Sequence, residues 1–573
     1  MAAVFGAVIN SLHPGLAHWD PAIRRSEHSD FQSNALFALA KLTGSKPRDL
    51  ATDLRPKLDG GPIDRVELSG PGYLNISIRD EAIWNQIAAR LKSPRLGIGA
   101  PERGTRTVID YSAPNVAKEM HVGHLRTTII GDCLARLLDF LGSDVLRQNH
   151  LGDWGTQFGM LIQYLTENPS SNWKTADRQD HTDTITALDA LYKDARGKFD
   201  TDASFADRSR SRVVLLQSGD AETLRLWREI VAESEKAFHA IYTRLGVLLK
   251  PDDSVGESFY NTRLQAVINE LVAQDVAVES DGALVIFSRL FMRPDGDPVP
   301  LIVRKRDGGY GYDTTDLATI RYRIKELTAD RLLYVTDARQ SMHFQMIFEA
   351  AKEARWLEER VQCEHVPYGM VLGPDGRPFK TRSGDTVRLM DLLDSAVARA
   401  RAVVSEKVPH LESHDLDQIA ESAGLAAVKY ADLSTSRTKD YTFDLDRMVS
   451  FSGNTGVYLQ YAHARICSIL RKTDEHPIDV DLSAPLEPAE RNLALSLDAY
   501  GGILMETART FEPHRLCTYL YDTARNFTSF YEACNVLNAK GSIRDNRIAI
   551  CQLTQRTLKH GLELLGISAP ERM

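Results

Sequence analysis

The feature that most constrains the fold is a pair of histidines, His121 and His124, where a strand pattern gives way to a helix pattern. The apolar, β-branched residues 107–111 predict a buried strand, and the amphipathic residues 125–141 predict a helix. Residues three apart lie on one face of a helix, so both imidazoles would face the same way. The N–H groups and dipole of a helix N-terminus attract anions, and Gly123 leaves the backbone open. The pattern therefore favours phosphate chemistry where a strand enters a helix.

Two other interpretations of the histidine pair fit the residues alone. The pair could cap the helix without touching a ligand, or it could supply half of a metal site. A zinc site needs further ligands, and the sequence places none at suitable spacing. We therefore expect no metal held by protein ligands, whereas phosphate binding and helix capping both stay open at this point.

The composition is that of a globular protein with several domains. Of 573 residues, 43% are hydrophobic and 26% are charged, and this length suffices for about two to four domains. The six cysteines are scattered without a Cys-x-x-Cys pair, which favours reduced thiols over disulfides. The N-terminus lacks the basic start of a signal peptide, and no run of about 18 apolar residues exists. We expect a cytoplasmic protein with no membrane partner.

The net charge of −9 argues against a general nucleic-acid coat, but the charge is unevenly distributed. Residues 426–573 carry 17 Lys and Arg against 18 Asp and Glu, and 12 of those 17 are Arg. Arginine is well suited to phosphates and base edges. A solvated helical surface explains the same balance, so RNA binding by this third of the chain is one of two interpretations.

The first region, residues 1–105, predicts a small α+β domain. Residues 29–40 resemble a capped helix, and residues 66–78 predict two strands around a Gly-Pro-Gly turn. Residues 92–105 are rich in Gly, Pro and Arg and are typical of a linker.

Two further regions follow. Residues 106–410 alternate strands and helices in the βαβ rhythm of a parallel sheet, with a charged, less regular insertion at about 170–300. No Gly-x-Gly-x-x-Gly follows the first strand, so a dinucleotide fingerprint is absent. Over residues 411–573 strand signals vanish and apolar residues recur at helical spacing, which predicts an all-helical bundle.

Five separated blocks, in one order, resemble the class I arginyl-tRNA synthetases over the whole chain. Residues 112–126 resemble that family's form of the class I histidine signature. The other blocks are 152–159 (Gly-Asp-Trp-Gly-Thr-Gln-Phe-Gly), 310–316, the entry to the helical region at 429–433 with 453–455 and 458–461, and the C-terminus at 564–573.

The resemblance implies an α/β fold. It comprises a Rossmann-like parallel-sheet catalytic domain over 106–410, an N-terminal α+β domain over 1–105, and an all-α anticodon-binding bundle over 411–573. It implies an arginine–tRNA ligase, which activates L-arginine with ATP to arginyl-adenylate and pyrophosphate. Arginine then passes to the 2′-OH of the terminal adenosine of tRNA(Arg), and Mg2+ accompanies the ATP.

One block departs from the class pattern. Class I enzymes usually carry Lys-Met-Ser-Lys after the last core strand, where this chain has Phe379-Lys-Thr-Arg-Ser-Gly384. Many family members share this divergence, and Lys118 is then thought to supply the missing charge. The division of labour among Lys118, Lys380 and Arg382 stays open. The resemblance assigns catalysis to Lys118, His121, His124 and Lys380, and ATP binding to His121, Gly123, His124, Lys380 and Arg382.

The resemblance also assigns the amino-acid site. A guanidinium is a planar fork of N–H donors that carboxylates match well, and Asp110, Tyr312 and Asp316 are implied to hold it. The α-amino and carboxylate end is implied to contact Asn115, His124 and Gln340.

Taken singly, four of these residues have ordinary explanations. These are a helix N-terminal acid for Asp316, core packing for Tyr312, a turn for Asn115 and a solvated loop for Gln340. Their combination with the histidine signature is what favours a site.

For RNA, the resemblance implies that the N-terminal domain touches the D-loop of the tRNA and that the helical domain touches the anticodon. Candidate rings for base stacking are Tyr458, Tyr461, Tyr519, Phe527 and Tyr531, although helical spacing favours core packing for most of them. The resemblance favours a monomer.

Three rival functions share parts of this pattern. Small-molecule nucleotidylyltransferases also use His-x-Gly-His, but they are usually short and lack such a helical third. A duplicated synthetase could charge an acceptor other than tRNA, and a silent paralogue could bind RNA alone. The intact signature and arginine-site residues argue against silence. Isoacceptor preference and a requirement for tRNA in the activation step stay open, as does a housekeeping or specialised role.

Overall fold

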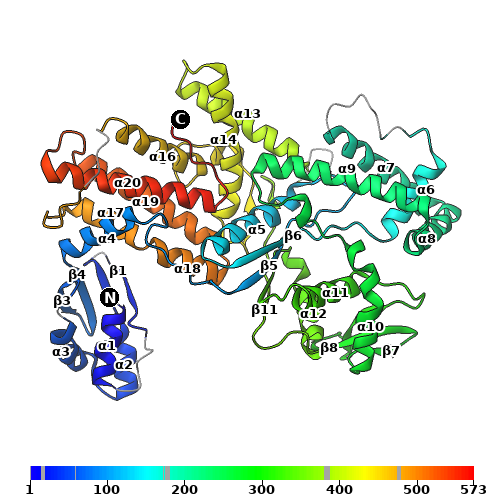
Figure 1. The fold of residues 1–573 in the computed structure, drawn as a ribbon, viewed down its shortest axis with the longest axis horizontal. Coiled ribbons are helices and arrows are strands. Elements are labelled where there is room, and N and C mark those ends of the chain that lie inside the picture. Colours follow the sequence, from blue (N-terminus) through cyan, green and yellow to red (C-terminus); the bar gives the residue numbers. More distant parts are fainter. Residues whose placement is uncertain are drawn as a thin grey trace.

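A four-stranded parallel sheet in the order β11-β10-β5-β6 forms the centre of the catalytic region (Figure 1). Its strands are β5 (Arg106–Asp110), β6 (Asp144–Gln148), β10 (Arg331–Tyr334) and β11 (Gln362–His365). The two central strands, β5 and β10, consist largely of buried residues, among them the apolar Val108, Ile109, Leu332 and Leu333, as expected for strands covered on both faces. Because every pairing is parallel, the carboxyl ends of the strands meet at one edge. This arrangement confirms the predicted α/β class.

The computed structural model describes residues 2–13, 20–26, 28–58, 60–171, 173, 181–379, 387–473 and 479–573. Lys380 and Arg382 lie outside the described residues. In the part of the chain that is described, no helix combines the length and apolar character needed to cross a bilayer.

Helices connect and cover the sheet. Helix α5 (Val122–Phe140) joins β5 to β6 and is buried along most of its length. Helix α11 (Tyr312–Lys325) precedes β10, and η3 (Ala338–Gln340) with α12 (Ser341–Glu353) joins β10 to β11. Since α5, α11 and α12 all begin on the side of the carboxyl strand ends, their N-terminal turns surround one edge of the sheet.

The insertion is more regular than its sequence pattern indicates. It contains a helical layer, in which α9 is long and amphipathic, and an antiparallel sheet in the order β7-β8-β9. The charged residues that obscure the periodicity lie on the outer faces of the long helices. The elements are α6 (Thr156–Glu167), α7 (His181–Thr201), α8 (Ala203–Ser218), α9 (Ala221–Leu245), η1 (Pro251–Asp253), η2 (Glu257–Arg263), α10 (Leu264–Ala273), β7 (Val278–Ser280), β8 (Ala283–Met292) and β9 (Pro298–Arg304).

The N-terminal region packs three helices and α4 with an antiparallel sheet in the order β1-β2-β4-β3. The two strands around the Gly-Pro-Gly turn are confirmed as β3 and β4. The helix expected from residue 29 begins only at Ala35, because Phe31–Ser33 forms strand β2 and pairs with β4. The elements are α1 (Ala2–Leu12), β1 (Ile23–Arg25), β2 (Phe31–Ser33), α2 (Ala35–Thr43), α3 (Pro47–Leu58), β3 (Ile63–Ser69), β4 (Tyr73–Ile78) and α4 (Asp80–Lys92).

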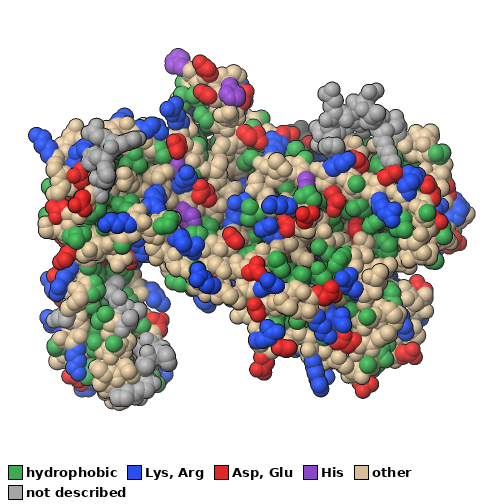
Figure 2. Space-filling view, in the orientation of Figure 1, with side chains coloured by type: hydrophobic (Ala, Val, Ile, Leu, Met, Phe, Trp, Pro, Cys, Tyr) green, Lys and Arg blue, Asp and Glu red, His purple; other side chains and the backbone are tan. Residues whose placement is uncertain are grey.

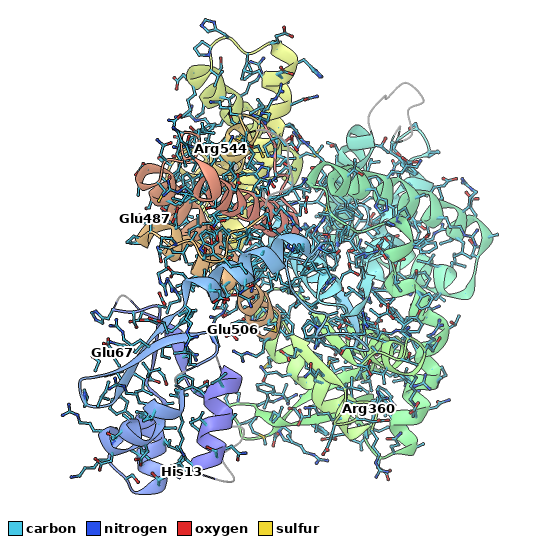
Figure 3. All side chains as sticks on the ribbon, turned by 60° about the vertical axis from the view of Figure 1, so that its left-hand side comes forward. His13, Glu67, Arg360, Glu487, Glu506 and Arg544 are labelled. Carbon is cyan, nitrogen blue, oxygen red and sulfur yellow. The ribbon has the colours of Figure 1, made fainter. Side chains whose placement is uncertain are left out.

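The C-terminal region is a helical bundle, apart from the two-residue strand β13 (Tyr441–Thr442), which pairs with β12 (Val371–Leu372) of the catalytic region. Its helices are α13 (Leu389–Lys407), α14 (Ser413–Leu433), α15 (Leu445–Met448), α16 (Gly456–Leu470), α17 (Pro488–Asp498), α18 (Tyr500–Thr510), α19 (Pro513–Ala533) and α20 (Gly541–Leu564). In Figure 3, Glu67 lies on the N-terminal domain, Arg544 on the bundle and Arg360 on the catalytic region.

A buried ion pair joins the catalytic region to the bundle. Arg126 of α5 is fully buried and contacts Asp432 of α14 at 3.3 Å. Its guanidinium also donates to the carbonyl of Lys439 at 2.9 Å. Since Lys439 lies just before β13, the helix carrying the histidine pair is tied to the segment that holds β12.

A second arginine docks the N-terminal domain on the bundle. Arg491 of α17 donates to both carboxylate oxygens of Asp30, at 2.7 and 2.5 Å, and also contacts Asp80 and the carbonyl of Ile78. Trp84 adds a hydrogen bond of 2.8 Å to the carbonyl of Ala484. The space-filling view shows that the N-terminal domain projects from the bundle beside an open notch (Figure 2). The polar contacts of Arg491 and Trp84 therefore help to fix the orientation of the N-terminal domain on the bundle.

We predict that Arg491→Ala loosens this docking, because Asp30 loses its main cationic partner. Loss of charged hydrogen bonds should cost about 1.5–3 kcal/mol. Hydrogen exchange of β4 and α4 should accelerate correspondingly. The control Arg509→Ala removes an arginine that is 70% exposed and pairs with Glu506 on its own helix. In this control the hydrogen exchange of β4 and α4 should equal that of wild type. Equal exchange in wild type and Arg491→Ala would contradict the docking role.

Candidate active site

The carboxyl edge of the sheet brings Asp110 beside Gln148 and Tyr334, which are its partners on the neighbouring strands. Arg323 of α11 donates to Asp110 Oδ2 at 2.7 Å and to Gln148 Oε1 at 2.8 Å. Burial opposes the charge of Arg323, but the Asp110 carboxylate together with Tyr334 and Tyr260 outweighs it, and the pKa of the guanidinium is raised. One oxygen of Asp110 is thus occupied by a guanidinium of the protein itself.

The loop between β5 and α5 adopts a backbone that L-residues rarely use. Ser112, Ala113 and Ala117 have φ angles of 76°, 46° and 63°, in the left-handed region, which costs roughly 1–2 kcal/mol per residue. Backbone strain of this kind persists only where the surroundings over-determine it.

Hydrogen bonds from three neighbouring elements supply that constraint. The N–H of Ser112 donates to Thr127 Oγ1 at 3.0 Å, that of Ala113 to Asn149 Oδ1 at 2.9 Å, and that of Ala117 to Ser234 Oγ at 3.0 Å. The buried Tyr242 hydroxyl lies 2.7 Å from the hydroxyl of Ser112 and accepts from the Asn149 amide. The loop is therefore held by α5, the end of β6 and α9 together.

The histidine pair closes the loop and opens α5. The N–H of Gly123 donates to His121 Nδ1 at 3.0 Å, and the N–H of His121 donates to His124 Nδ1 at 3.1 Å. The rings lie 4.1 Å apart. A Cβ on residue 123 would stand 2.7 Å from the His121 ring. Gly123 is therefore needed because the ring itself covers the backbone there.

These bonds decide which ring nitrogen carries the proton. Since both Nδ1 atoms accept from backbone N–H groups, a neutral ring must carry its hydrogen on Nε2. Burial, followed by the neighbouring His121, lowers the pKa of His124 to about 3. Burial, followed by Lys118, lowers the pKa of His121. Both histidines are consequently neutral Nε2–H donors at a helix N-terminus, so capping and anion binding are compatible.

Lys118 lies on the same loop and packs against the insertion. Its ammonium sits 4.4 Å from the ring centre of Tyr192 on α7, within the range of a cation–π contact. The adjacent Glu119 accepts from Thr186 of α7 and contacts Arg388 at 3.3 Å. Helix α7 thus borders the signature loop.

Acidic side chains gather at the first turn of α11. Asp316 Oδ2 lies 2.6 Å from His343 Nε2, and Asp313 Oδ1 lies 3.4 Å from His343 Nδ1. Tyr312, 67% exposed, meets the same imidazole edge-on at 5.3 Å. Burial opposes protonation of His343, but the bonds to Asp313 and Asp316 outweigh it and raise its pKa to about 9. His343 is therefore an imidazolium at neutral pH.

Sequence reasoning missed Glu257, which adds a half-buried carboxyl to this acidic group. Burial, then the charges of Asp153 and Asp316, raise the pKa of Glu257 to about 8, and a backbone hydrogen bond from Trp154 limits the rise. Asp153 accepts from the N–H and hydroxyl of Ser258, at 2.9 and 2.6 Å. The Gly-Asp-Trp-Gly block was the available signal, whereas Glu257 lies about 100 residues further along the chain, without a spacing pattern.

The remaining predicted residues lie near these groups. Asn115 is exposed and pairs with Gly152 through backbone bonds, and a Cβ on Gly152 would stand 2.5 Å from Asn115 Oδ1. Gln340 is exposed at the N-cap of α12, three residues before His343. The structure therefore brings Asp316, Gln340, His343 and Glu257 to one edge, with Asn115 beside the Gly152 block. Among the described residues, no group of three or more His, Cys, Asp or Glu is arranged to hold a metal ion.

The candidate RNA-stacking rings divide by burial. Tyr519 and Phe527 are buried in the bundle, so for these two rings core packing is confirmed and base stacking is excluded. Tyr461 is 43% exposed. Tyr531 is half-buried, and the guanidinium of Arg465 lies over its ring, 5.1 Å from the ring centre. Charges of both signs are interspersed on the face shown in Figure 2.

Comparison with known proteins places this geometry in context. Family models match as "tRNA synthetases class I (R), catalytic domain" over residues 86–445, "DALR anticodon binding domain" over 459–573 and "Arginyl tRNA synthetase N terminal domain" over 2–78. The arginine–tRNA ligase of Frankia casuarinae is 64% identical, covering 99% of this chain and 97% of its own. That of Thermobifida fusca is 51% identical, covering 97% and 95%.

Two solved structures are similar over the entire chain. Arginyl-tRNA synthetase from Plasmodium falciparum aligns with a TM-score of 0.85 at 29% identity, covering 100% of this chain and 98% of its own. The Thermus thermophilus enzyme aligns with a TM-score of 0.84 at 26% identity, covering 100% and 99%.

We predict that His343 stabilises the protein in a pH-dependent way. Its pKa is about 9 when folded and 6.5 ordinarily, so its contribution is complete below about pH 6.5 and is lost as the pH rises through about 9. His343→Ala should therefore cost on the order of 2 kcal/mol at pH 6 and far less at pH 9.5.

Melting temperatures of wild type and His343→Ala, measured from pH 6 to 9.5, check this prediction. The melting temperature of Met342→Ala, at an exposed neighbouring position, should differ from that of wild type by the same amount at every pH. A deficit in His343→Ala that does not change with pH would show that the ion pairs contribute nothing.

Proposed function

This chain belongs to the class I arginyl-tRNA synthetase family, and on that premise we propose that its histidine loop positions ATP while the acidic turn of α11 holds L-arginine. As an arginine–tRNA ligase it forms arginyl-tRNA. One observation supports the assignment above the others: two neutral imidazoles with Nε2–H groups free of described partners begin α5, at the same sheet edge as the Asp316 carboxylate.

The reaction has two steps. The arginine carboxylate attacks the α-phosphorus of ATP, forming arginyl-adenylate and releasing pyrophosphate. The 2′-hydroxyl of the terminal adenosine of tRNA(Arg) then takes the arginyl group, and AMP leaves. Such displacement depends on positioning and on neutralising negative charge that spreads over the phosphate oxygens.

The signature loop supplies donors and charge for that step. His121 and His124 donate from Nε2 to phosphate oxygens, and loss of one such donor should cost about 2–4 kcal/mol of transition-state stabilisation. Gly123 contributes to ATP binding by letting the His121 ring lie against the backbone, and Lys118 offsets pyrophosphate charge. Lys380 and Arg382 remain proposed partners in that role. Mg2+ accompanies ATP on the phosphate oxygens, which are its preferred ligands.

The amino acid lies between the first turns of α11 and α12. Asp316 and Glu257 receive the guanidinium, with Tyr312 along its side. Asp110 contributes through the oxygen that Arg323 leaves free, or by fixing Arg323 behind the pocket. The α-amino and carboxylate end faces Asn115, Gln340 and His124.

The helical bundle is proposed to bind the anticodon of tRNA(Arg) and the N-terminal domain its D-loop. The working form is proposed to be a cytoplasmic monomer, because all site residues come from one chain. A mass of 64.0 kDa in solution, measured by light scattering, would agree with a monomer, and twice that mass would contradict it.

A charging assay tests the proposed function directly. Purified protein, ATP and tRNA should incorporate arginine and none of the other amino acids. Pyrophosphate exchange with and without tRNA then shows whether activation needs RNA. Arginine-dependent exchange with no transfer to tRNA would favour a duplicated synthetase acting on another acceptor.

We predict that Asp316→Asn raises the KM for arginine about 30- to 150-fold, equivalent to about 2–3 kcal/mol, because a charged partner of the guanidinium is lost. The KM for ATP should change less than about threefold. Glu326→Gln, at the other end of α11 and paired with Arg263, is the matched control. An arginine KM unchanged in Asp316→Asn would remove this residue from the site.

We also predict that arginine binding releases a proton at pH 7. Glu257, with its pKa near 8, is mostly protonated in the free protein, and an incoming guanidinium favours the ionised form. Calorimetry in two buffers of different ionisation enthalpy should show release of roughly 0.5–0.9 proton. Glu257→Gln should abolish the release. A binding enthalpy that does not depend on the buffer would contradict the prediction.

A further inference from the structure

One imidazole joins the first turns of α11 and α12. His343, in the first turn of α12, contacts Asp316 at 2.6 Å through Nε2 and Asp313 at 3.4 Å through Nδ1. The two carboxylates are three residues apart on α11 and lie on one face of it. The single imidazole ring of His343, in the first turn of α12, therefore contacts two carboxylates of α11.

The surroundings give this ring one orientation. Tyr312 packs edge-on at 5.3 Å and Phe344 at 5.4 Å. The His343 side chain is 21% exposed, against 20% for Asp316 and 14% for Asp313. Rotation of the ring would leave partly buried carboxylates without a donor, which is costly.

Only one oxygen of Asp316 is committed to this contact. His343 binds Oδ2, and Oδ1 accepts no hydrogen bond from the residues that the structure describes. A carboxylate held at one oxygen has a fixed plane, and its other oxygen then points in a defined direction. A guanidinium needs such a fixed acceptor more than a point charge does.

We propose that His343 is a positioning residue for arginine: it fixes the plane of the Asp316 carboxylate and the separation between Asp316 and Gln340. This inference rests on the proposed role of Asp316 in holding the guanidinium. His343 does not touch the reacting atoms. Its effect reaches the substrate through Asp316 on one side and through the first turn of α12, which carries Gln340, on the other.

The charge balance supports the same role. The charges of Asp153 and Asp316 act on Glu257, and His343 lies against both Asp313 and Asp316. The imidazolium offsets the two acids of α11, while Glu257, with its raised pKa of about 8, keeps its proton at neutral pH. A contact that only joined α11 to α12 could use Asp313 alone, whereas His343 also binds Asp316, the carboxylate proposed to hold the substrate.

Amide substitutions separate the two contacts of His343. The Gln Nε2 atom reaches about as far as His Nε2, and the Asn Nδ2 atom about as far as His Nδ1. His343→Gln therefore retains the donor to Asp316, whereas His343→Asn retains only the donor to Asp313. In arginine-dependent pyrophosphate exchange with tRNA, His343→Ala and His343→Asn should raise the KM for arginine at least tenfold. His343→Gln should stay within about threefold of wild type.

The KM for ATP should be unchanged in all three variants, and Met342→Ala should match wild type throughout. A second measurement asks whether His343 acts through Asp316. In an Asp316→Asn background, adding His343→Ala should raise the arginine KM by a smaller factor than it does in wild type, because the route through the Asp316 carboxylate is already lost and only the route through Gln340 remains.

The outcomes separate the two proposals. If Asp316→Asn leaves the arginine KM unchanged, the proposed site fails. If Asp316→Asn raises it and His343→Ala does not, the site stands and the positioning role is overturned. Equal effects of the Gln and Asn variants, or full additivity with Asp316→Asn, also overturn it. Circular dichroism shows which variants are folded, and His343→Gln and His343→Asn decide the question should His343→Ala unfold.

Discussion

The hydrogen bonds that hold the β5–α5 loop are the constraint on which the rest of the site depends. Ser112, Ala113 and Ala117 occupy left-handed backbone conformations that their own side chains disfavour. Thr127, Asn149 and Ser234 accept from the N–H groups of these residues, so the cost is met by contacts from elsewhere in the fold. The histidine pair can then begin α5 at one fixed height above the sheet.

Two kinds of electrostatic surroundings follow at the same sheet edge. On the α5 side, buried and neutral imidazoles present N–H donors, and Lys118 provides charge. On the α11 side, carboxylates dominate, balanced by the His343 imidazolium and by Arg323 bound to Asp110. We propose that anionic triphosphate binds on the α5 side and cationic arginine on the α11 side, which would orient the carboxylate of the amino acid toward phosphorus.

Local pattern predicts much of this arrangement. The β-branched run, the helix period after residue 124 and the turn at Gly-Pro-Gly each depend on neighbours in sequence, and the structure confirms them. Strand β2 at Phe31–Ser33 was predicted as helix because its pairing with β4 is non-local. Glu257, His343 and the Arg323–Asp110 pair were missed for the same reason. His343 and Arg323 contact carboxylates that lie 27 and 213 residues away in the sequence, and Glu257 interacts with Asp153 and Asp316 only because the fold brings them together. The individual roles of the site residues stay predictions, and Lys380 and Arg382 lie outside the described structure.

The protonation of the two signature histidines tests the central claim most directly. Long-range ¹H–¹⁵N correlation spectra of protein labelled at histidine distinguish hydrogen on Nε2 from hydrogen on Nδ1, with His121→Asn and His124→Asn providing the assignments. The account predicts that both neutral rings carry hydrogen on Nε2 only, that His124 shows no titration between about pH 6 and 8, and that the pKa of His121 lies below its ordinary value. A ring that titrates near its ordinary pKa of 6.5, or that carries hydrogen on Nδ1, would contradict it.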